Sequence, residues 1–292
     1  SPENSFLYNG TELCASMMPT CDRVLTYEIF SNCIKTSEIL GMDNLFADSL
    51  REALTLLPPI RLRENGGVRE WMEDYEEAHP NHRHTTHLLA LYPYSQISLD
   101  KTPDLAAGAR KTIEDRLAAD GWEDTEWSRA NMICFYARLK DAQMAYESVR
   151  MFEQNFLADN LLSISPAGIA GAESDIYAFD GNTATAAGIA EMLIQDHEGY
   201  IEFLPCLPDQ WKSGSFRGLC VRGGLEVDLD WKDGMLRAAA LKSTMEYTFR
   251  IKMDDLNGVK FLINGKNEQP EEEKEGLLSF SLNKDDKLII SY

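Results

Sequence analysis

The sequence lacks the features of several broad classes of protein. It has 28 lysine and arginine residues against 48 aspartate and glutamate residues, which gives a formal net charge of −20. Nucleic acids and anionic membrane faces require a cationic surface, so neither is expected as a partner. No window approaches the roughly 20 consecutive apolar residues of a membrane-spanning helix. This composition favours a neutral ligand.

Motifs for common metal and cofactor chemistries are also missing. The six cysteines are scattered and form no C-x-x-C pair, so we interpret them as small core residues rather than zinc ligands. The sequence contains no H-E-x-x-H motif, P-loop, dinucleotide fingerprint or G-x-S-x-G elbow. We therefore expect neither a metal nor a cofactor.

The chain also lacks an initiator methionine and a signal peptide. It opens with Ser1-Pro2-Glu3-Asn4-Ser5, which is typical of the middle of a loop and suggests a fragment. A targeting signal would then lie upstream, so its absence says nothing about location. The 292 residues suffice for two domains with cores of their own.

The first two thirds of the chain show a helical period, with apolar residues recurring at three- and four-residue spacing. Gly41 and the Pro58-Pro59 pair are expected to end the first two helices, while Asp43, Thr102, Asp141 and Thr183 are expected to cap helices. Residues 1–21 and 158–179 are interpreted as loops. The predicted helices cover 22–40, 45–57, 71–75, 102–117, 125–139, 141–156 and 183–196.

The period changes near His197. Apolar and polar residues alternate from Leu225 to Lys232, and the Asp233-Gly234 and Asn264-Gly265 pairs indicate turns. Residues 197–292 therefore read as an antiparallel β domain, predicted to be a sandwich, after a helical domain of residues 1–196.

Asp180-Gly181-Asn182-Thr183 precedes a helix built of small residues. Gly and Asn tolerate positive φ, so this stretch predicts a tight loop that holds Asp180 at the mouth of a buried helix. The simpler alternative is that Asp180 is only a turn residue.

Four of the five histidines lie between His79 and His87. The segment could be a solvated polar loop, a metal site, or a sugar subsite in which His and Arg donors lie beside Trp and Tyr rings. The flanking aromatic residues favour the sugar subsite. Glu123, Asp124 and Glu126 precede a helix and are interpreted as structural.

Four motifs in register resemble glycoside hydrolase family 95, the inverting α-L-fucosidases. The first resembles H-R-H-x-x-H-L…L-Y-P, the second W-S…A-R-L, the third D-G-N…G-I-A-E-M-L, and the fourth the L-P…W linker with its following Gly-rich stretch. In this sequence they are His82–Leu88 with Leu91–Pro93, Trp127-Ser128 with Ala137–Leu139, Asp180–Asn182 with Gly188–Leu193, and Leu204–Trp211 with Gly218–Gly224.

The resemblance implies the C-terminal part of an (α/α)6 toroid followed by a β-sandwich, with an upstream domain of the same enzyme expected. It implies hydrolysis of terminal α-L-fucosyl or α-L-galactosyl residues from glycans and a secreted or periplasmic location. By the same resemblance the catalytic carboxylates are Glu3, with Asp22 as the alternative general acid, and Asp180. The residues implied to bind sugar are Arg83, His84, Trp127 and Asn182.

Inversion gives these carboxylates a geometric expectation. Glu3 and Asp180 should face one cleft, with a separation of about 6.5–9.5 Å rather than the roughly 5–5.5 Å of a retaining enzyme. Arg83 and His84 should line the same cleft.

This sequence departs from the family at Thr183-Ala184 and Glu126, where D-G-N-F-G and G-W-S are usual. Alternatives are a non-catalytic glycan-binding protein or another (α/α)6 carbohydrate-active enzyme, such as a phosphorylase.

Overall fold

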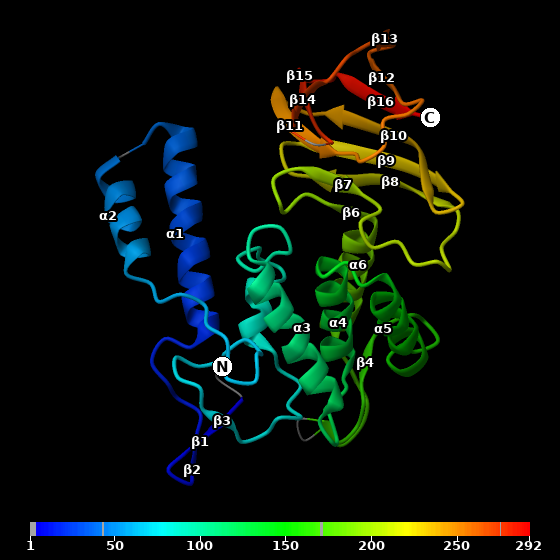
Figure 1. Ribbon diagram of the computed structural model, residues 1–292. Helices are drawn as coiled ribbons and strands as arrows, with labels where there is room; N and C mark the ends of the chain where they lie inside the picture. Colours follow the sequence, from blue (N-terminus) through cyan, green and yellow to red (C-terminus); the bar gives the residue numbers. More distant parts are fainter. Residues whose placement is uncertain (1–3, 43, 170–171, 275) are drawn as a thin grey trace. The chain divides into compact units, whose positions relative to one another are not determined.

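The computed structural model describes residues 4–42, 44–169, 172–274 and 276–292, and its contacts divide the chain into two compact units. The first comprises Ser1–Ser128 and Pro166–Asp175, and the second comprises Arg129–Ser165 and Ile176–Tyr292. Helices dominate as far as residue 193 and strands follow, which confirms a helical region followed by a β-rich region (Figure 1). No helix in the described ranges is long and apolar enough to span a bilayer.

The first unit holds two long helices, a shorter one, a 3-10 helix and a small sheet with strand order β2-β1-β3. Its elements are α1 (Thr20–Leu40), α2 (Asn44–Thr55), η1 (Thr86–Ala90), α3 (Pro103–Ala118), β1 (Phe6–Tyr8), β2 (Thr11–Leu13) and β3 (Glu76–Glu77).

Local signals set most helix ends in this unit. Gly41 ends α1 in the left-handed conformation at φ 61°, and Pro103 begins α3 with Thr102 at its N-cap position, as predicted. Helix α2 stops ahead of Pro58. The predicted cap Asp43 lies outside the described residues.

The interpretation of residues 1–21 as a loop is wrong, because β1 and β2 form a hairpin there. Asn9 and Gly10 both have positive φ, 50° and 75°. An Asn-Gly pair with these angles makes the two-residue turn that best matches the twist of a hairpin. The signal is local and could have been found in the sequence.

The helix predicted at 71–75 is also wrong, and β3 interrupts the region that was expected to contain helices alone. The ring of Phe6 stacks on Tyr75 at 4.3 Å between centroids and lies 5.1 Å from Trp71. Trp71 and Tyr75 therefore pack against Phe6 of strand β1 instead of forming a helix. Phe6 also pairs with Glu77 in the sheet. Within the described residues this leaves six α-helices, one fewer than expected.

The second unit holds three helices and most of the strands. Helix α4 begins in the first unit and continues into the second. The elements are α4 (Glu126–Arg138), α5 (Ala142–Asn155), α6 (Phe179–Leu193), β4 (Ile164–Ser165), β5 (Ile176–Tyr177), β6 (Ile194–Gln195), β7 (Ile201–Phe203), β8 (Gly214–Val221), β9 (Leu225–Lys232), β10 (Met235–Ser243), β11 (Tyr247–Lys252), β12 (Lys260–Ile263), β13 (Lys266–Asn267), β14 (Glu271–Lys274), β15 (Leu277–Leu282) and β16 (Lys287–Ser291).

Two features of the helical part differ from expectation. The segment 158–179 is not all loop, because β4 pairs with β5. Helix α6 begins at Phe179 with Ala178 as its N-cap residue, so Thr183 does not cap it. The Thr183 hydroxyl instead donates to the carbonyls of Phe179 and Asp180 one turn earlier. The Asp141 side chain caps α5 by accepting a hydrogen bond from Met144 N at 3.2 Å, as predicted.

The β-rich part contains a six-stranded sheet, β13-β12-β16-β10-β9-β8, and a five-stranded sheet, β14-β15-β11-β7-β6. Residues from both sheets form one apolar core. Along β9 the residues Leu225, Val227, Leu229 and Trp231 are buried, which confirms the alternation. The pairing of β11 with β7 is parallel, so the prediction of a wholly antiparallel domain is wrong at this pair.

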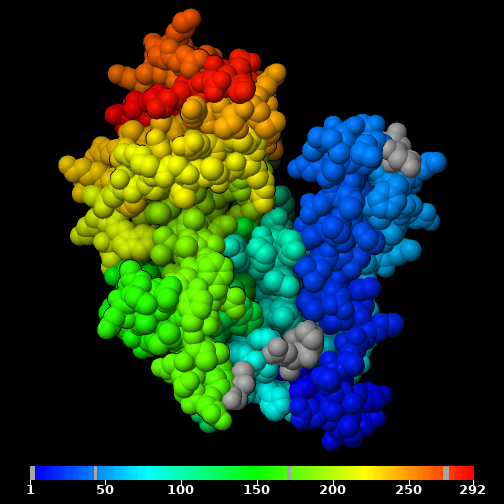
Figure 2. All heavy atoms as spheres, turned by 180° about the vertical axis from the view of Figure 1, so that it is seen from behind, coloured from blue at the N-terminus to red at the C-terminus, as the bar shows by residue number. Residues whose placement is uncertain are grey.

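Helices α1 and α2 carry an unusual amount of exposed apolar surface, and they lie in the lighter blue part of the surface in Figure 2, next to the dark blue of the residues before α1. Leu45, Leu56 and Ile39 are each more than 70% exposed. Large apolar side chains gathered on one helical hairpin mark a contact surface more often than scattered single residues do. The exposed set is Leu25, Tyr27, Ile29, Ile39, Leu40, Met42, Leu45, Phe46 and Leu56.

Candidate functional site

The histidine segment, His79–His87, contains a turn closed by a hydrogen bond from His82 N to His79 O at 3.0 Å, and it ends in the 3-10 helix η1. The backbone N–H of His84 donates to Nδ1 of His82 at 3.0 Å, and the two rings meet edge to face at 4.9 Å. Burial, together with the charges of His84 and Arg83, lowers the pKa of His82 to about 4. His82 is therefore neutral at pH 7 and acts as an acceptor that fixes His84.

His84 lies against Trp127, which is in the first turn of α4. Their rings meet at 69° with 4.7 Å between centroids, and both side chains are half-buried. The structure thus brings together two of the predicted sugar-binding residues, which are 43 positions apart in the sequence. A donor ring beside an aromatic face is an arrangement that suits a hydroxyl-rich, C–H-rich ligand.

Arg83 contacts Glu123 through two hydrogen bonds. The Arg83 backbone N–H and its guanidinium NH1 both donate to Oε2 of Glu123, at 3.2 and 3.1 Å. Burial opposes ionisation of Glu123, but the Arg83 bonds and charge outweigh that effect and lower the pKa of this carboxyl. Glu123, interpreted from the sequence as only structural, thus orients a predicted sugar-binding residue.

The loop before α4 is held in place by its own capping bonds. Thr125 and Ser128 exchange hydrogen bonds, from Thr125 N to Ser128 Oγ at 2.8 Å and from Ser128 N to Thr125 Oγ1 at 3.1 Å. This is a reciprocal capping box with Ser at its third helical position. The Glu123 N–H donates to the carbonyl of Asn81 at 3.0 Å, which joins this loop to the histidine segment.

Asp180 and Asn182 lie in the first turn of α6, in the second unit. Asp180 is exposed, and the helix dipole favours a negative charge at this position. The expectation of a tight loop before a wholly buried helix is wrong, because Asp180, Gly181 and Asn182 are helical. The buried residues of α6 are Gly181, Gly188, Met192 and Leu193.

The Asn182 amide connects α6 to the preceding loop. Its Oδ1 accepts from Ser163 N at 2.8 Å and from Ser163 Oγ at 3.0 Å, and its Nδ2 donates to the carbonyl of Leu161 at 2.9 Å. These bonds hold the N-terminus of α6, and with it Asp180, in a fixed position. Its role in sugar binding stays a prediction.

Helices α4 and α6 lie in close contact. A Cβ added to Gly188 would come within 2.6 Å of Ile133 Cγ2, so only glycine allows this approach. Arg138 and Glu191 form a two-pronged ion pair, with Nε–Oε2 at 2.7 Å and NH2–Oε1 at 2.9 Å. The residues of two separate sequence motifs thus meet at one helix contact.

A buried polar cluster lies beneath β1 and the histidine segment. Asn4 is fully buried and donates from Nδ2 to Glu70 Oε2 at 2.8 Å and to Glu77 Oε2 at 3.4 Å. Glu70 is 3% exposed and also accepts from Thr86 Oγ1 at 3.4 Å, while His87 Nδ1 lies 3.5 Å from Glu70 Oε2. Burial, with a contribution from Arg116, lowers the pKa of His87 to about 3.

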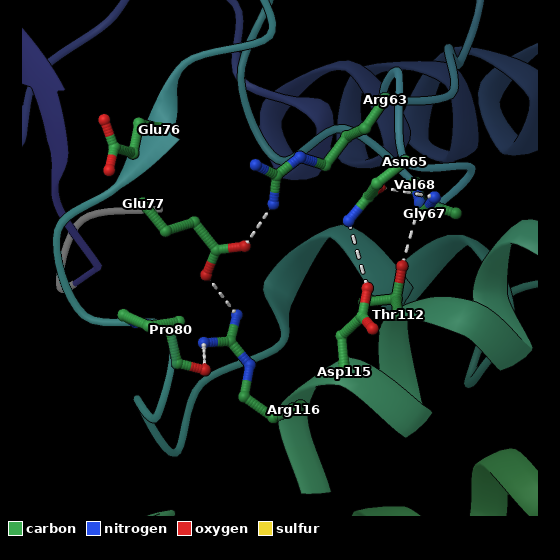
Figure 3. A pocket seen from close by; sticks show the side chains of 10 residues that line it. All are labelled: Arg63, Asn65, Gly67, Val68, Glu76, Glu77, Pro80, Thr112, Asp115 and Arg116. Atoms are coloured by element: carbon green, nitrogen blue, oxygen red, sulfur yellow. Dashed lines mark hydrogen bonds and ion pairs between the residues drawn. The ribbon is translucent and has the colours of Figure 1, made fainter. Parts of the chain in front are cut away.

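A cavity of about 340 Å³ lies next to this cluster (Figure 3). Glu77 lies between two arginines, with Arg63 NH1 at 2.6 Å and Arg116 NH2 at 2.9 Å from its oxygens. Arg116 also donates to the carbonyls of His79 and Pro80. The guanidinium groups that line the cavity are thus engaged in holding β3 and the start of the histidine segment.

The remaining predicted positions are distributed as follows. Glu3 lies outside the described residues, and the alternative acid Asp22 is exposed in the first turn of α1. Arg83, His84 and Trp127 belong to the first unit, whereas Asp180 and Asn182 belong to the second. A shared cleft and the separation of Glu3 from Asp180 therefore stay predictions.

Two further expectations concern cysteine and metal. Cys14 and Cys220 are exposed, so the interpretation of the cysteines as core residues is wrong for these two; Cys220 lies on an outward position of β8. Among the described residues no three His, Cys, Asp or Glu side chains are arranged to hold a metal ion.

Sequence comparison identifies relatives over most of the chain. Alpha-L-fucosidase 2 of Arabidopsis thaliana is 32% identical over 280 residues, which cover 91% of this chain and 32% of that protein. Probable alpha-fucosidase A of Aspergillus oryzae is 24% identical over 236 residues, covering 74% of this chain and 32% of the relative. Its Aspergillus niger counterpart is 25% identical over 265 residues, covering 82% and 31%. The chain spans about a third of the length of these relatives.

Two family profiles divide the chain between them. The glycosyl hydrolase family 95 catalytic domain matches residues 1–193, and the glycoside hydrolase family 95 C-terminal domain matches residues 195–290. The first profile includes the histidine segment, Trp127 and Asp180, and the second includes both sheets of the β-rich part except Ile194 of β6 and Ser291 of β16. The chain belongs to glycoside hydrolase family 95.

Proposed function

We propose that this chain carries sugar-binding and catalytic residues of a glycoside hydrolase that removes terminal α-L-fucosyl, or α-L-galactosyl, residues from glycans. The observation that carries the proposal is the cluster of Arg83, His84 and Trp127, with Arg83 oriented by Glu123 and His84 by His82. Membership of the family and the names of the fucosidase relatives support the substrate class.

The proposed mechanism is direct displacement with inversion. Glu3, or alternatively Asp22, donates a proton to the glycosidic oxygen as the bond to the sugar breaks. A water molecule attacks the anomeric carbon from the opposite face, and Asp180 assists removal of its proton. Asp180 suits this role because it is exposed at a helix N-terminus where negative charge is favoured.

The sugar-binding residues have distinct tasks in this proposal. Arg83 and His84 donate hydrogen bonds to sugar hydroxyls, Trp127 presents a ring edge or face to the C–H groups, and Asn182 acts near Asp180. The proposed hydrogen bonds and ring contact with the sugar do not require a metal ion. A chelator is therefore expected to leave activity unchanged.

We also propose the finer architecture. The helices form the C-terminal part of an (α/α)6 toroid, the two sheets form a β-sandwich, and the domains meet near residues 196 and 197. The exposed apolar side chains of α1 and α2 then contact further helices supplied by an upstream part of the same enzyme or by a partner chain. Their exposure, and the length of the relatives, support this arrangement.

The architecture can be tested by comparing this chain with the longer protein. We expect the 292-residue chain alone to release little fucose, and addition of the upstream segment to raise the rate and protect α1 and α2 from amide hydrogen exchange. Full turnover of a fucosyl oligosaccharide by the isolated chain would contradict the proposal.

The catalytic assignment is tested by titrating a fucosylated oligosaccharide against the full-length protein while fucose release is measured. Glu3→Gln and Asp180→Asn should each lower kcat by at least about 100-fold, because each removes a proton-transfer or water-activating group. Binding should persist in both variants. Tight binding without release by the unmodified protein would favour the glycan-binding alternative instead.

A further inference from the structure

We propose that Asn4 and Glu70 are positioning residues that hold the segment bearing Glu3, so that this carboxyl is presented to the glycosidic oxygen. The inference rests on the proposed function, in which Glu3 is the general acid. Neither residue is proposed to touch the substrate. The geometry of Asn4, Glu70 and Glu77, here called the anchor cluster, points to this role.

Both polar atoms of the Asn4 side chain form hydrogen bonds. It is 0% exposed, and a buried amide is costly unless its donors and acceptor are paired. Its Nδ2 donates to one carboxylate at 2.8 Å and to a second at 3.4 Å, and its Oδ1 accepts from Ser5 N at 3.1 Å. Of the neutral side chains, a short amide is suited to bridging two carboxylates in this way.

The cluster is itself fixed from several directions. Glu70 accepts from Thr86 in η1, and its backbone carbonyl accepts from Thr20 N at 2.9 Å at the start of α1. Glu77 is held by Arg63 and by the buried Arg116 (Figure 3). Asn4 therefore binds to groups that are attached to α1, η1, α3 and β3 at once.

The main chain after Asn4 is fixed as well. The Ala78 N–H donates to the Ser5 carbonyl at 2.9 Å, and the adjacent Phe6 pairs with Glu77 and stacks on Tyr75. Glu3 directly precedes Asn4 in the sequence, so one peptide unit joins it to an anchored residue. A general acid needs positioning to within about 0.5 Å, and the anchor cluster supplies a fixed point next to it.

The chemistry offers a variant that damages the cluster without changing its shape. Asn4→Asp places a third carboxylate beside Glu70 and Glu77, and removes both donated hydrogen bonds. Asn4→Asp combined with Glu70→Gln restores a donor and an acceptor in exchanged positions, with the same total charge as the unmodified pair. Asn4→Ala is a milder variant that removes the amide and adds no charge.

The test measures kcat in the full-length protein on two substrates. A fucosyl oligosaccharide has a poor leaving group that needs protonation, whereas 2,4-dinitrophenyl fucoside releases a phenolate that does not. Loss of acid positioning should lower kcat on the oligosaccharide by about 100-fold or more and on the aryl fucoside by less than about 5-fold. Asn4→Ala should show the same selectivity to a smaller degree, and the double variant should regain at least about 10-fold on the oligosaccharide.

Two comparisons make the result interpretable. Asn65→Asp is the matched control, because Asn65 also donates to a carboxylate, Asp115 at 3.1 Å, but at an exposed position; it should leave the ratio of the two rates unchanged. Equal losses on both substrates in the Asn4 variants, or no recovery in the double variant, would overturn the inference. Glu3→Gln is measured alongside: if it too lacks selectivity, the assignment of Glu3 fails, and if it alone is selective, only the anchoring role fails.

Discussion

At the scale of single residues, the histidine segment contains buried and half-buried histidines. His82 and His87 are buried, and burial keeps both neutral at pH 7. His84 is half-buried against Trp127 and is the histidine proposed to bind sugar. The packing around each ring therefore distinguishes histidines that are close in the sequence.

His84→Phe should weaken substrate binding without unfolding the segment. Phenylalanine keeps an aromatic ring against Trp127 but cannot donate a hydrogen bond to a sugar hydroxyl. One lost hydrogen bond of about 1.4 kcal/mol corresponds to a 10-fold rise in KM. Steady-state kinetics and the melting temperature test this together. An unchanged KM, or a loss of activity cured by zinc, would contradict the sugar-binding role.

His87 should make the fold sensitive to acid. Its pKa is about 3 in the folded protein against an ordinary value of 6.5, so the unfolded chain binds the proton more readily. The stability that it contributes is complete above pH 6.5 and declines as pH falls towards 3, at about 1.4 kcal/mol per pH unit. Glu70, at 3.5 Å, and the nearby Arg116 face the same ring.

Urea unfolding at pH 7, 6, 5 and 4 measures this slope. His87→Gln should reduce the slope of the unfolding free energy against pH by the contribution of one proton, about 1.4 kcal/mol per pH unit. This reduction is expected whatever the stability of the variant at pH 7. An identical slope in the His87→Gln variant would show that this residue is not the source.

At the scale of elements, the contact between α4 and α6 connects two helices whose paired residues, Arg138 and Glu191, are 53 positions apart in the sequence. Arg138 and Glu191 pair across it, and Gly188 leaves no room for a side chain beside Ile133. This contact supports the helix that carries Asp180 at its other end. A substitution that disturbs this helix contact should therefore change the free energy of unfolding.

Gly188→Ala should destabilise the protein by about 1–3 kcal/mol, because the added Cβ would overlap Ile133 Cγ2. Without that overlap the same change would stabilise a helix interior by about 1 kcal/mol, so the sign of the effect is diagnostic. Ile133→Ala in the same chain should cancel much of the added cost in a double-mutant cycle. A stabilising Gly188→Ala would show that the helices are not in close contact.

Elements whose ends carry local signals were predictable, and those decided by distant residues were not. Gly41, Pro103 and Asp141 act within one turn of their helices, and the alternation of β9 reports its own burial. The segment around Trp71 and Tyr75 failed because its partner, Phe6, is 65 positions from Trp71 in the chain.

The same distinction applies to the site. The motif containing Arg83 and His84 could be found in the sequence, whereas Glu123 and Glu70 could not be distinguished from other acidic residues. Their importance comes from contacts with Arg83 and Asn4 made across 40 and 66 positions. The prediction that Thr183 caps α6 was wrong because the helix already starts at Phe179. The bond between Asn182 and Ser163, 19 positions apart, helps to hold this earlier start.

At the scale of the whole molecule, the family assignment joins features that the two units show separately. The first unit contains Arg83, His84 and Trp127, which are proposed to bind sugar, and the second contains Asp180 at an exposed helix end. An inverting hydrolase needs both, with an acid on one side of the glycosidic bond and an activated water on the other. The exposed apolar side chains of α1 and α2 are consistent with a larger assembled enzyme.

Hydrolysis of an α-L-fucosyl linkage with inversion, as proposed, determines the stereochemistry of the first product. Proton NMR of a fucosyl oligosaccharide with the full-length protein should be recorded within the first minutes, before the anomers equilibrate. We expect β-L-fucose to appear first and α-L-fucose only later through mutarotation. Initial appearance of α-L-fucose would mean retention and would contradict the mechanism.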